Sequence, residues 1–134
     1  MNKPVLTAVM PVFNGEKYLK EAIDSVLVQT FKNFELIIIN DGSTDSSLNI
    51  IKAYTDPRIR LIDNQTNCGI PFSRNLGLKE ARGEFLTWCD CDDINLPSRF
   101  ETQVNFLKNN SRFGACGTWL VRFGKRYIRI LKAH

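Results

Sequence analysis

The sequence predicts an α/β domain of three layers, in which helices cover both faces of a mainly parallel sheet. The chain has 134 residues, 43% of them hydrophobic and 24% charged, which is typical of a single folded domain. Short apolar runs of strand length alternate along it with amphipathic stripes of helical spacing. Strands and helices that alternate in this way form right-handed crossovers, and the strands that they connect are parallel.

The first third of the chain predicts a strand, a helix and a second strand. Residues 5–12 form an apolar run that is short enough for a strand. A helix follows, because apolar residues then recur with helical spacing; they are Leu19, Ala22, Ile23, Val26 and Leu27. Residues 34–39 contain three consecutive isoleucines, which favours a strand buried on both faces.

The middle of the chain repeats this alternation. Ser43 or Thr44 can cap a second helix, and residues 58–63 alternate as a third strand. A third helix is predicted over residues 71–81, because a proline opens this segment and a glycine follows it. Residues 84–89 predict the fourth strand.

The last part of the chain predicts one more helix and a small amount of strand. Pro97 is a good first-turn residue for a helix that places Phe100 inward. A strand is predicted near residues 113–121, and a hairpin through Gly124 leads into residues 127–131. The whole pattern predicts a Rossmann-like sheet.

Composition excludes several classes of protein. No apolar run approaches the ~20 residues of a membrane-spanning helix, and the N-terminus lacks the features of a signal peptide, so we expect a cytoplasmic protein. The cysteines fit no paired zinc-ligand spacing, and we expect reduced core thiols; they are Cys68, Cys89, Cys91 and Cys116. The single histidine, His134, is the last residue, which argues against a Ser-His or Cys-His nucleophile.

The net charge of +4 is concentrated at the C-terminal end. Residues 122–134 carry five basic residues and no acidic one, so the rest of the chain is nearly neutral. Such a tail is most often only solvated, although it could touch an anionic membrane surface or pair with a second chain as a last strand. We expect no nucleic-acid partner, and peripheral membrane contact and a homodimer stay open.

A Rossmann-like sheet binds ligands beyond the carboxyl ends of its strands. Turn-forming and polar residues gather at three such places, at 11–15 after the first strand, at 40–43 after the second and at 90–93 after the fourth. Each of the first two segments is also a good strand-to-helix turn by itself. Only their combination with the third segment points to a binding site.

The acidic run after the fourth strand needs a physical explanation. Asp90, Asp92 and Asp93 lie within four residues, and a like-charge pair about 4 Å apart costs about 4 kcal/mol at an effective dielectric constant of about 20. A divalent cation offsets this repulsion, and such oxygen ligands suit Mg²⁺ or Mn²⁺ held together with substrate phosphates. The alternative is a solvated loop in which Asp93 or Asn95 caps the next helix.

A phosphate-bearing ligand would depend on this metal, because the chain has neither a G-x-x-x-x-G-K-[ST] loop nor a G-x-G-x-x-G turn. Asp41, at the end of the second strand, could accept a hydrogen bond from a base or a ribose. Phe13 could offer an apolar edge to the base, or it could simply belong to the core.

Together these segments resemble the family 2 glycosyltransferases of the GT-A fold, which transfer sugars from nucleotide-sugar donors. The resemblance extends from residue 5 to about residue 121 and rests on five motifs in order. They are PVFN at 11–14, SVLVQT at 25–30, FELIIINDGSTD at 34–45, NCG at 67–69 with SRNLG at 73–77, and DCDD at 90–93 with Pro97 and Arg99 behind it.

The resemblance implies which residues would hold the donor. The turn from Pro11 through Phe13 to Asn14 would hold the nucleotide base, usually uracil, together with Asp41. Arg74 would lie near the base or the diphosphate, unless it is only a charge on the helix surface.

It also implies a metal site in the acidic run. Asp90 would approach the ribose or the sugar, and Asp92 would help to bind Mn²⁺ or Mg²⁺ with Asp93 beside it. The physical reason is that the leaving nucleoside diphosphate gains negative charge as the glycosidic bond breaks, and a divalent ion stabilises that charge.

Three features depart from the family pattern. Asn40 stands where many relatives carry an acid, and Ser73 replaces a frequent alanine. Inverting members use a carboxylate well downstream of the metal motif as general base, and no residue of this chain can be assigned to that role. Glu101 is available, but its place on a predicted helix favours a solvated side chain.

We therefore expect residues 1–134 to be a single domain, the donor-binding half of a glycosyltransferase whose acceptor half is missing. The complete enzyme would transfer a sugar from a UDP-sugar to a glycan or lipid acceptor with inversion, as in polysaccharide biosynthesis. The main alternative is an inactive donor-binding fragment or interaction module.

Two other classes of enzyme fit the sequence less well. A sugar-1-phosphate nucleotidyltransferase would need a glycine-rich loop after the first strand, and a haloacid-dehalogenase-type phosphatase would need Asp-x-Asp there; the chain has neither.

Overall fold

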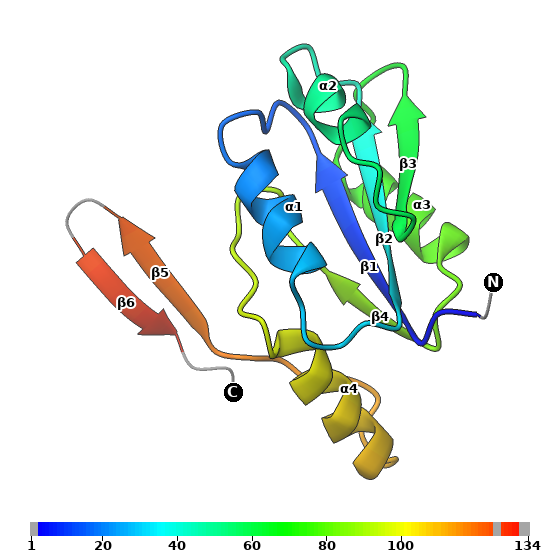
Figure 1. Ribbon diagram of the computed structural model, residues 1–134, viewed down its shortest axis with the longest axis vertical. Coiled ribbons are helices and arrows are strands. Elements are labelled where there is room, and N and C mark those ends of the chain that lie inside the picture. Colours follow the sequence, from blue (N-terminus) through cyan, green and yellow to red (C-terminus); the bar gives the residue numbers. More distant parts are fainter. Residues whose placement is uncertain (1–2, 125–126, 132–134) are drawn as a thin grey trace.

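The computed structural model describes residues 3–124 and 127–131 and confirms the α/β class (Figure 1). Four strands form a parallel sheet, and two more form a separate antiparallel hairpin. The elements are, in chain order, β1 (Leu6–Val12), α1 (Leu19–Leu27), β2 (Phe34–Asp41), α2 (Ser47–Lys52), β3 (Ile59–Asn64), α3 (Ile70–Glu80), β4 (Phe85–Trp88), α4 (Arg99–Asn109), β5 (Leu120–Gly124) and β6 (Tyr127–Leu131).

The four-stranded sheet has the order β3-β2-β1-β4. β1 pairs along its length with β2, so that Leu6 lies opposite Phe34 and Val12 opposite Asn40. Every residue of β2 is buried, as its isoleucine run predicts. Because β2 and β3 lie on one side of β1 and β4 lies on the other, the connections change direction between β1 and β4. Ligands bind at such a point, beyond the carboxyl ends of the strands.

Helices cover both faces of the sheet, which gives the three layers that the sequence predicts. One face packs against α1, α2 and α4, and the alternate residues of β1 that join this larger core are Leu6, Ala8, Met10 and Val12. On the other face Val9, Ile37 and Ile39 pack against Leu76 of α3. Figure 1 shows α1 on the near side of the sheet and α3 behind it.

A glycine sets the distance between α3 and the sheet. A Cβ atom added to Gly77 would lie only 2.3 Å from a methyl carbon of Val9 in β1, so no side chain fits between the helix and the strand. The close approach fixes the helix that carries Ser73 and Arg74 one turn earlier. α3 therefore brings these residues to the carboxyl edge of the sheet.

Two of the predicted boundaries are wrong. The strand expected at 113–121 begins only at Leu120, because Gly114 and Gly117 interrupt the preceding segment. The hairpin through Gly124 is confirmed, with Leu120 opposite Leu131.

The start of α2 also differs from the prediction. The helix begins at Ser47, and neither Ser43 nor Thr44 caps it. Both residues instead form hydrogen bonds with the turn after β1. The backbone amide of Asn14 donates to Ser43 Oγ at 3.0 Å, and the backbone amide of Thr44 donates to Asn14 Oδ1 at 2.8 Å. Ser43 and Thr44 therefore connect the loop after β2 to the loop after β1 and do not cap α2.

The cysteine prediction holds only in part. All four thiols are free, but Cys89 alone is buried, Cys68 is exposed, and Cys91 and Cys116 are half-buried. Among the described residues no helix is both long and apolar enough to cross a membrane. The expectations of membrane contact and a homodimer rest on the basic tail, of which Lys125, Arg126, Lys132 and His134 lie outside the described residues.

Candidate functional site

A cavity of about 680 Å³ opens at the carboxyl edge of the sheet, next to the neighbouring strands β1 and β4. Its size falls within the ~300–1,000 Å³ of typical small-molecule sites. Seven of the eight residues singled out from the sequence line it: Pro11, Phe13, Asn14, Asp41, Arg74, Asp90 and Asp92. Asp93 is not among its lining residues.

Phe13 is a surface residue and not part of the core. Its side chain is 47% exposed, whereas the preceding Val12 is buried and belongs to the larger core. The difference arises because β1 ends at Val12 and Phe13 lies in the bend that follows, beyond the packed part of the sheet. Phe13 therefore offers an aromatic face at the cavity, where a flat ring of a ligand can stack on it.

Asn14 fastens the turn after β1 to the turn after β2. Its backbone has φ of +50°, a left-handed conformation that asparagine tolerates better than most residues. Its Oδ1 accepts hydrogen bonds from the amides of Thr44 at 2.8 Å and Asp45 at 3.3 Å. Glu16 adds a further link, because its amide donates to Asp45 Oδ2 at 3.0 Å. Most of the bonding capacity of the Asn14 carbonyl is thus used within the protein.

Asp41 is almost fully buried at the end of β2 and organises the loop that precedes α3. Its carboxylate accepts hydrogen bonds from Asn64 Nδ2 at 2.9 Å, from the Cys68 amide at 3.1 Å and from the Gly69 amide at 2.7 Å. Burial alone would raise the pKa of Asp41, but these hydrogen bonds outweigh it and hold the pKa below the ordinary value. Asp41 is therefore ionised, and three donors take most of its acceptor sites.

Gly42 allows the same loop to approach the turn after β2. Its φ is +69°, and an added Cβ would lie 2.6 Å from the Asn67 nitrogen. Only glycine fits such a contact in this conformation. The loop after β2 and the loop before α3 are therefore in contact through their backbones. Asn67 and Gly69 of the second loop line the cavity.

Arg74 and Asp90 form an ion pair in the lining of the cavity. Arg74 Nη2 lies 3.3 Å from Asp90 Oδ1, and both side chains are about half exposed, so the ion pair adds little to stability. The Arg74 guanidinium also lies 5.5 Å from the centre of the Trp88 ring. Arg74 is therefore more than a solvated helix charge, because the cavity edge holds it from two sides.

The acidic run is split by the structure. Asp90 and Asp92 line the cavity and Asp93 does not. The pKa of the Asp93 carboxyl lies above its ordinary value because of burial first, and then because of the negative charges of Asp90 and Asp92, which Arg99 only partly offsets. In the part of the chain that the structure describes, no three His, Cys, Asp or Glu side chains converge on a common metal position.

The cavity also has lining residues that the sequence analysis did not assign. They are Val12, Gly15, Lys17, Tyr18, Asn67, Gly69, Ile70, Ser73 and Cys91. Lys17 adds a second positive charge to the lining, and its ammonium group lies 4.8 Å from the centre of the Tyr18 ring. The sequence carries no spacing pattern that singles out Lys17, whereas the NCG and SRNLG motifs already contained Asn67, Gly69 and Ser73.

The donor set fits a divalent cation that is shared with a ligand. Asp90 and Asp92 provide hard oxygen atoms on exposed side chains at the cavity. Mg²⁺ and Mn²⁺ are commonly held by one or two carboxylates while phosphates and water complete the shell. After burial, the negative charges of Asp90 and Asp92 contribute to the raised pKa of the Asp93 carboxyl, and a cation at this loop would relieve that repulsion. A cation with a diphosphate matches this arrangement better than a cation held by protein alone.

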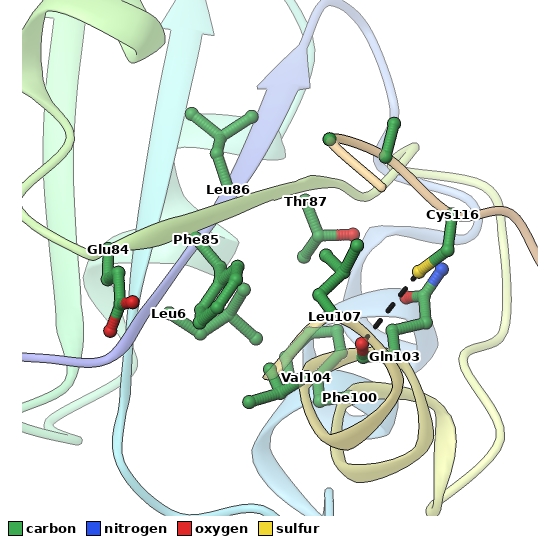
Figure 2. A pocket seen from close by; sticks show the side chains of 12 residues that line it. Leu6, Glu84, Phe85, Leu86, Thr87, Phe100, Gln103, Val104, Leu107 and Cys116 are labelled. Atoms are coloured by element: carbon green, nitrogen blue, oxygen red, sulfur yellow. Dashed lines mark hydrogen bonds between the residues drawn. The ribbon is translucent and has the colours of Figure 1, made fainter. Parts of the chain in front are cut away.

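A second cavity, of about 270 Å³, has a different character (Figure 2). Figure 2 shows it between the start of the sheet and α4, where Leu6, Phe85, Phe100 and Val104 gather. Glu84 is the one charged residue in its lining, and none of the eight site residues predicted from the sequence lies there. The first cavity, which combines an aromatic ring with charges of both signs, is therefore the candidate site.

Glu101 lies away from the candidate site. It is an exposed residue in the first turn of α4, and its Oε2 accepts a hydrogen bond from Thr30 Oγ1 at 2.7 Å. It does not line the cavity. This placement agrees with a solvated helix side chain.

The fold and this site define a class of protein: an α/β domain with a polar and aromatic cavity at the switch point of a parallel sheet. The sequence profile of glycosyl transferase family 2 matches residues 7–133. The chain belongs to glycosyl transferase family 2, which confirms the resemblance seen in its motifs.

Two curated relatives illustrate the match. A Haemophilus influenzae protein described as an uncharacterized glycosyltransferase is 43% identical over 112 residues, which cover 82% of this chain and 45% of the relative. EpsE of Bacillus subtilis, a candidate glycosyltransferase by its name, is 40% identical over 134 residues, which cover 96% of this chain and 48% of the relative. The chain thus spans about half the length of the curated relatives that it matches.

Solved structures show the same fold. The S. aureus protein TarS, residues 1–349, in complex with UDP superposes with a TM-score of 0.74 at 31% identity, over 79% of this chain and 32% of that one. The mannosyltransferase PcManGT of Pyrobaculum calidifontis, in complex with GDP-Man and Mn²⁺, gives a TM-score of 0.65 at 23% identity, over 88% of this chain and 34% of that one. These neighbours are glycosyltransferases of the GT-A fold, which confirms the predicted fold class.

Proposed function

We propose that residues 1–134 form the donor-binding half of an inverting glycosyltransferase, and that this half binds a nucleoside-diphosphate sugar, a UDP-sugar in the first place, with Mn²⁺ or Mg²⁺. One observation carries the proposal. A single cavity at the switch point joins an aromatic ring and a buried carboxylate on one wall to Arg74, Asp90 and Asp92 on the other. TarS, solved with UDP and with UDP-GlcNAc, supports the choice of donor.

On the first wall the chain holds the base and the ribose. Phe13 offers its exposed ring for stacking on the base. Asp41 orders the 64–69 loop and keeps its charge, so that its remaining acceptor capacity is directed to an N–H or O–H of the nucleoside. Asn14 and Pro11 fix the turn that carries Phe13. We propose that these residues select the nucleoside.

On the second wall the chain holds the diphosphate and the sugar. Arg74 leaves its exposed pairing with Asp90 for the more highly charged diphosphate, and Asp90 is then free to accept from the ribose or the sugar. Asp92 would help to hold the divalent ion, with Asp93 beside it adding negative charge. The ion, when bound, supplies positive charge to the leaving diphosphate.

The acceptor site and the general base belong to the part of a longer enzyme that this chain does not contain. The curated relatives are about twice as long, and PcManGT, which shares the fold, was solved with Mn²⁺. Glu101 is not a candidate base, because it lies outside the cavity and bonds to Thr30. We therefore expect the chain to bind the donor and to transfer sugar poorly or not at all by itself. The glycan or lipid acceptor, a role in polysaccharide biosynthesis and the cytoplasmic location stay predictions.

Calorimetric titration with UDP tests this proposal. The chain should bind UDP at least tenfold more tightly with 1 mM Mn²⁺ than with EDTA, because the carboxylates need the ion to tolerate the diphosphate. Asp92→Ala should abolish this gain and keep the circular-dichroism spectrum, while Glu21→Ala, an exposed charge on α1, should leave the gain unchanged.

Two outcomes would count against it. If the wild-type chain shows no metal-dependent binding at millimolar UDP, the donor site is wrong. If Asp92→Ala unfolds, the acidic run has a structural role instead. Hydrolysis of UDP-GlcNAc without an acceptor separates an active donor site from a binding module, since the module binds UDP but releases no sugar.

A further inference from the structure

One guanidinium group bridges the two ends of the acidic loop, residues 89–98. Arg99 Nη2 donates to the Trp88 carbonyl at 3.0 Å and to Thr87 Oγ1 at 2.9 Å, at the end of β4. Arg99 Nη1 donates to Asn95 Oδ1 and lies 3.6 Å from Cys89 Sγ. Both terminal nitrogens are fully used, so the planar fork fixes the distance between β4 and Asn95.

Asn95 is in turn attached to α1. It is buried, and its backbone amide donates to Ser25 Oγ at 3.0 Å, while Ser25 Oγ donates to the Ala22 carbonyl at 2.7 Å. A buried amide-to-hydroxyl chain of this kind is costly to break, because each freed group loses its partner without gaining water. Asn95 is therefore a fixed point at the far end of the loop.

Gln29 completes the attachment. Its side chain is fully buried, and its Nε2 donates to the carbonyls of Leu96 at 2.8 Å and Asn95 at 3.3 Å. Its Oε1 accepts from the Phe100 amide at 3.0 Å, in the first turn of α4. One residue just beyond the end of α1 thus holds the end of the loop and the start of the next helix together.

The middle of the loop has the opposite character. Residues 90 and 92–94 are exposed, and the side chains of Asp90 and Asp92 reach the cavity. Within this stretch the Asp93 amide donates to the Asp90 carbonyl at 3.2 Å, which makes a tight turn. Like charges on a short turn repel one another, so their separation depends on how firmly the ends of the turn are held.

We propose that Arg99 is the positioning residue of the acidic loop: by joining β4 to Asn95 it sets the separation of Asp90 and Asp92, and with it the affinity for a divalent ion and a diphosphate. Arg99 itself does not line the cavity. The proposal rests on the donor site proposed above and adds a residue that acts through the others. Groups that orient metal ligands in this way typically change metal affinity by about 10–100-fold when they are removed.

Arg99→Lys is the test variant, because lysine keeps the charge and loses the fork. Arg58→Lys is the matched control: Arg58 is also half-buried, donates to Asp56 and to the Leu27 carbonyl, and does not line the cavity. Thr87→Val is a milder second variant that removes one contact of Arg99 and keeps the shape of the side chain. It serves if Arg99→Lys does not fold.

Two measurements follow each variant. Amide hydrogen exchange without ligand, at Asp93 and Asn95, reports on the loop itself. Calorimetry with UDP plus and minus Mn²⁺, and with uridine, separates the metal end of the site from the base end. Arg99→Lys should speed exchange at both amides and reduce the Mn²⁺-dependent gain in UDP affinity about tenfold, while uridine affinity stays within about twofold. Thr87→Val should show a smaller change in the same direction, and Arg58→Lys none.

The outcomes are distinguishable. If Arg99→Lys keeps both the wild-type exchange and the wild-type gain from Mn²⁺, the proposal is overturned. A parallel loss of uridine and UDP affinity would also overturn it, because that pattern means general destabilisation. If the wild-type chain itself gains nothing from Mn²⁺, the donor site fails and the effect of Arg99 on affinity fails with it. The exchange data then decide separately whether Arg99 holds the loop.

Discussion

The two walls of the cavity carry similar polar side chains and use them differently. On the wall formed after β1 and β2, the side-chain oxygen atoms of Asn14 and Asp41 accept hydrogen bonds from backbone amides of neighbouring segments. On the wall formed after β4, Asp90 and Asp92 are exposed, and Arg99 holds their loop from behind. A polar residue at the end of a strand can therefore build a site or face its ligand, and its hydrogen bonds show which of the two it does.

The largest expected effect lies on the first wall. Asp41→Ala leaves Asn64 Nδ2 and the amides of Cys68 and Gly69 without their acceptor, and it should lower the free energy of unfolding by about 3 kcal/mol. Asp92→Ala on the second wall should change it by less than about 0.5 kcal/mol. Urea unfolding followed by circular dichroism measures both variants. Equal losses in the two would show that the walls do not differ.

Acid should weaken the first wall. Hydrogen bonds hold the pKa of Asp41 below the value of 3.8 that applies in the unfolded chain, so its ionised form stabilises the fold. This contribution is complete above pH 3.8 and is lost as the pH falls through the lower pKa of the folded state. The difference in unfolding free energy between the wild type and Asp41→Asn should therefore shrink between pH 5 and pH 2. A difference that stays constant with pH would mean that the charge of Asp41 contributes nothing.

The smallest effect belongs to the second wall. Asp93 is close to two other carboxylates, so Asp93→Asn should raise the free energy of unfolding by about 0.5 kcal/mol at pH 7 and low salt. The gain should become smaller in 1 mM Mn²⁺, because a bound ion balances the same repulsion. Thermal melting with and without Mn²⁺ measures this difference. A loss of stability in Asp93→Asn would show that the charge is balanced within the protein.

Most of the fold could be predicted from the sequence, because its signals are local. The isoleucines of β2 and the helical stripe from Leu19 to Leu27 each report burial through spacing, and both elements lie where spacing places them. The strand expected at 113–121 begins only at Leu120, because Gly114 and Gly117 interrupt the residues before it. The start of α2 failed because Asn14, 30 residues away, bonds to the residues expected to cap it.

The site was predicted at the level of position and less at the level of role. Strand order alone brings the segments after β1, β2 and β4 together, so residues that follow these strands could be assigned to one cavity. The number of hydrogen bonds at Asp41, the exposure of Phe13 and the distance from Arg99 to Asn95 depend on contacts between segments that are remote in the chain. Lys17 was missed because an isolated lysine in a loop has no spacing pattern.

The glycine after Asn14 places a limit on the width of the cavity. A Cβ at Gly15 would lie 3.2 Å from Cys91 Sγ, so the first turn and the acidic loop touch through a hydrogen atom and a thiol. The two walls meet at this contact, and a bulkier group on either side would push them apart. A thiol-reactive label on Cys91 would push the two walls apart at this contact. The rate at which the label reacts would report how far the walls separate when a ligand enters.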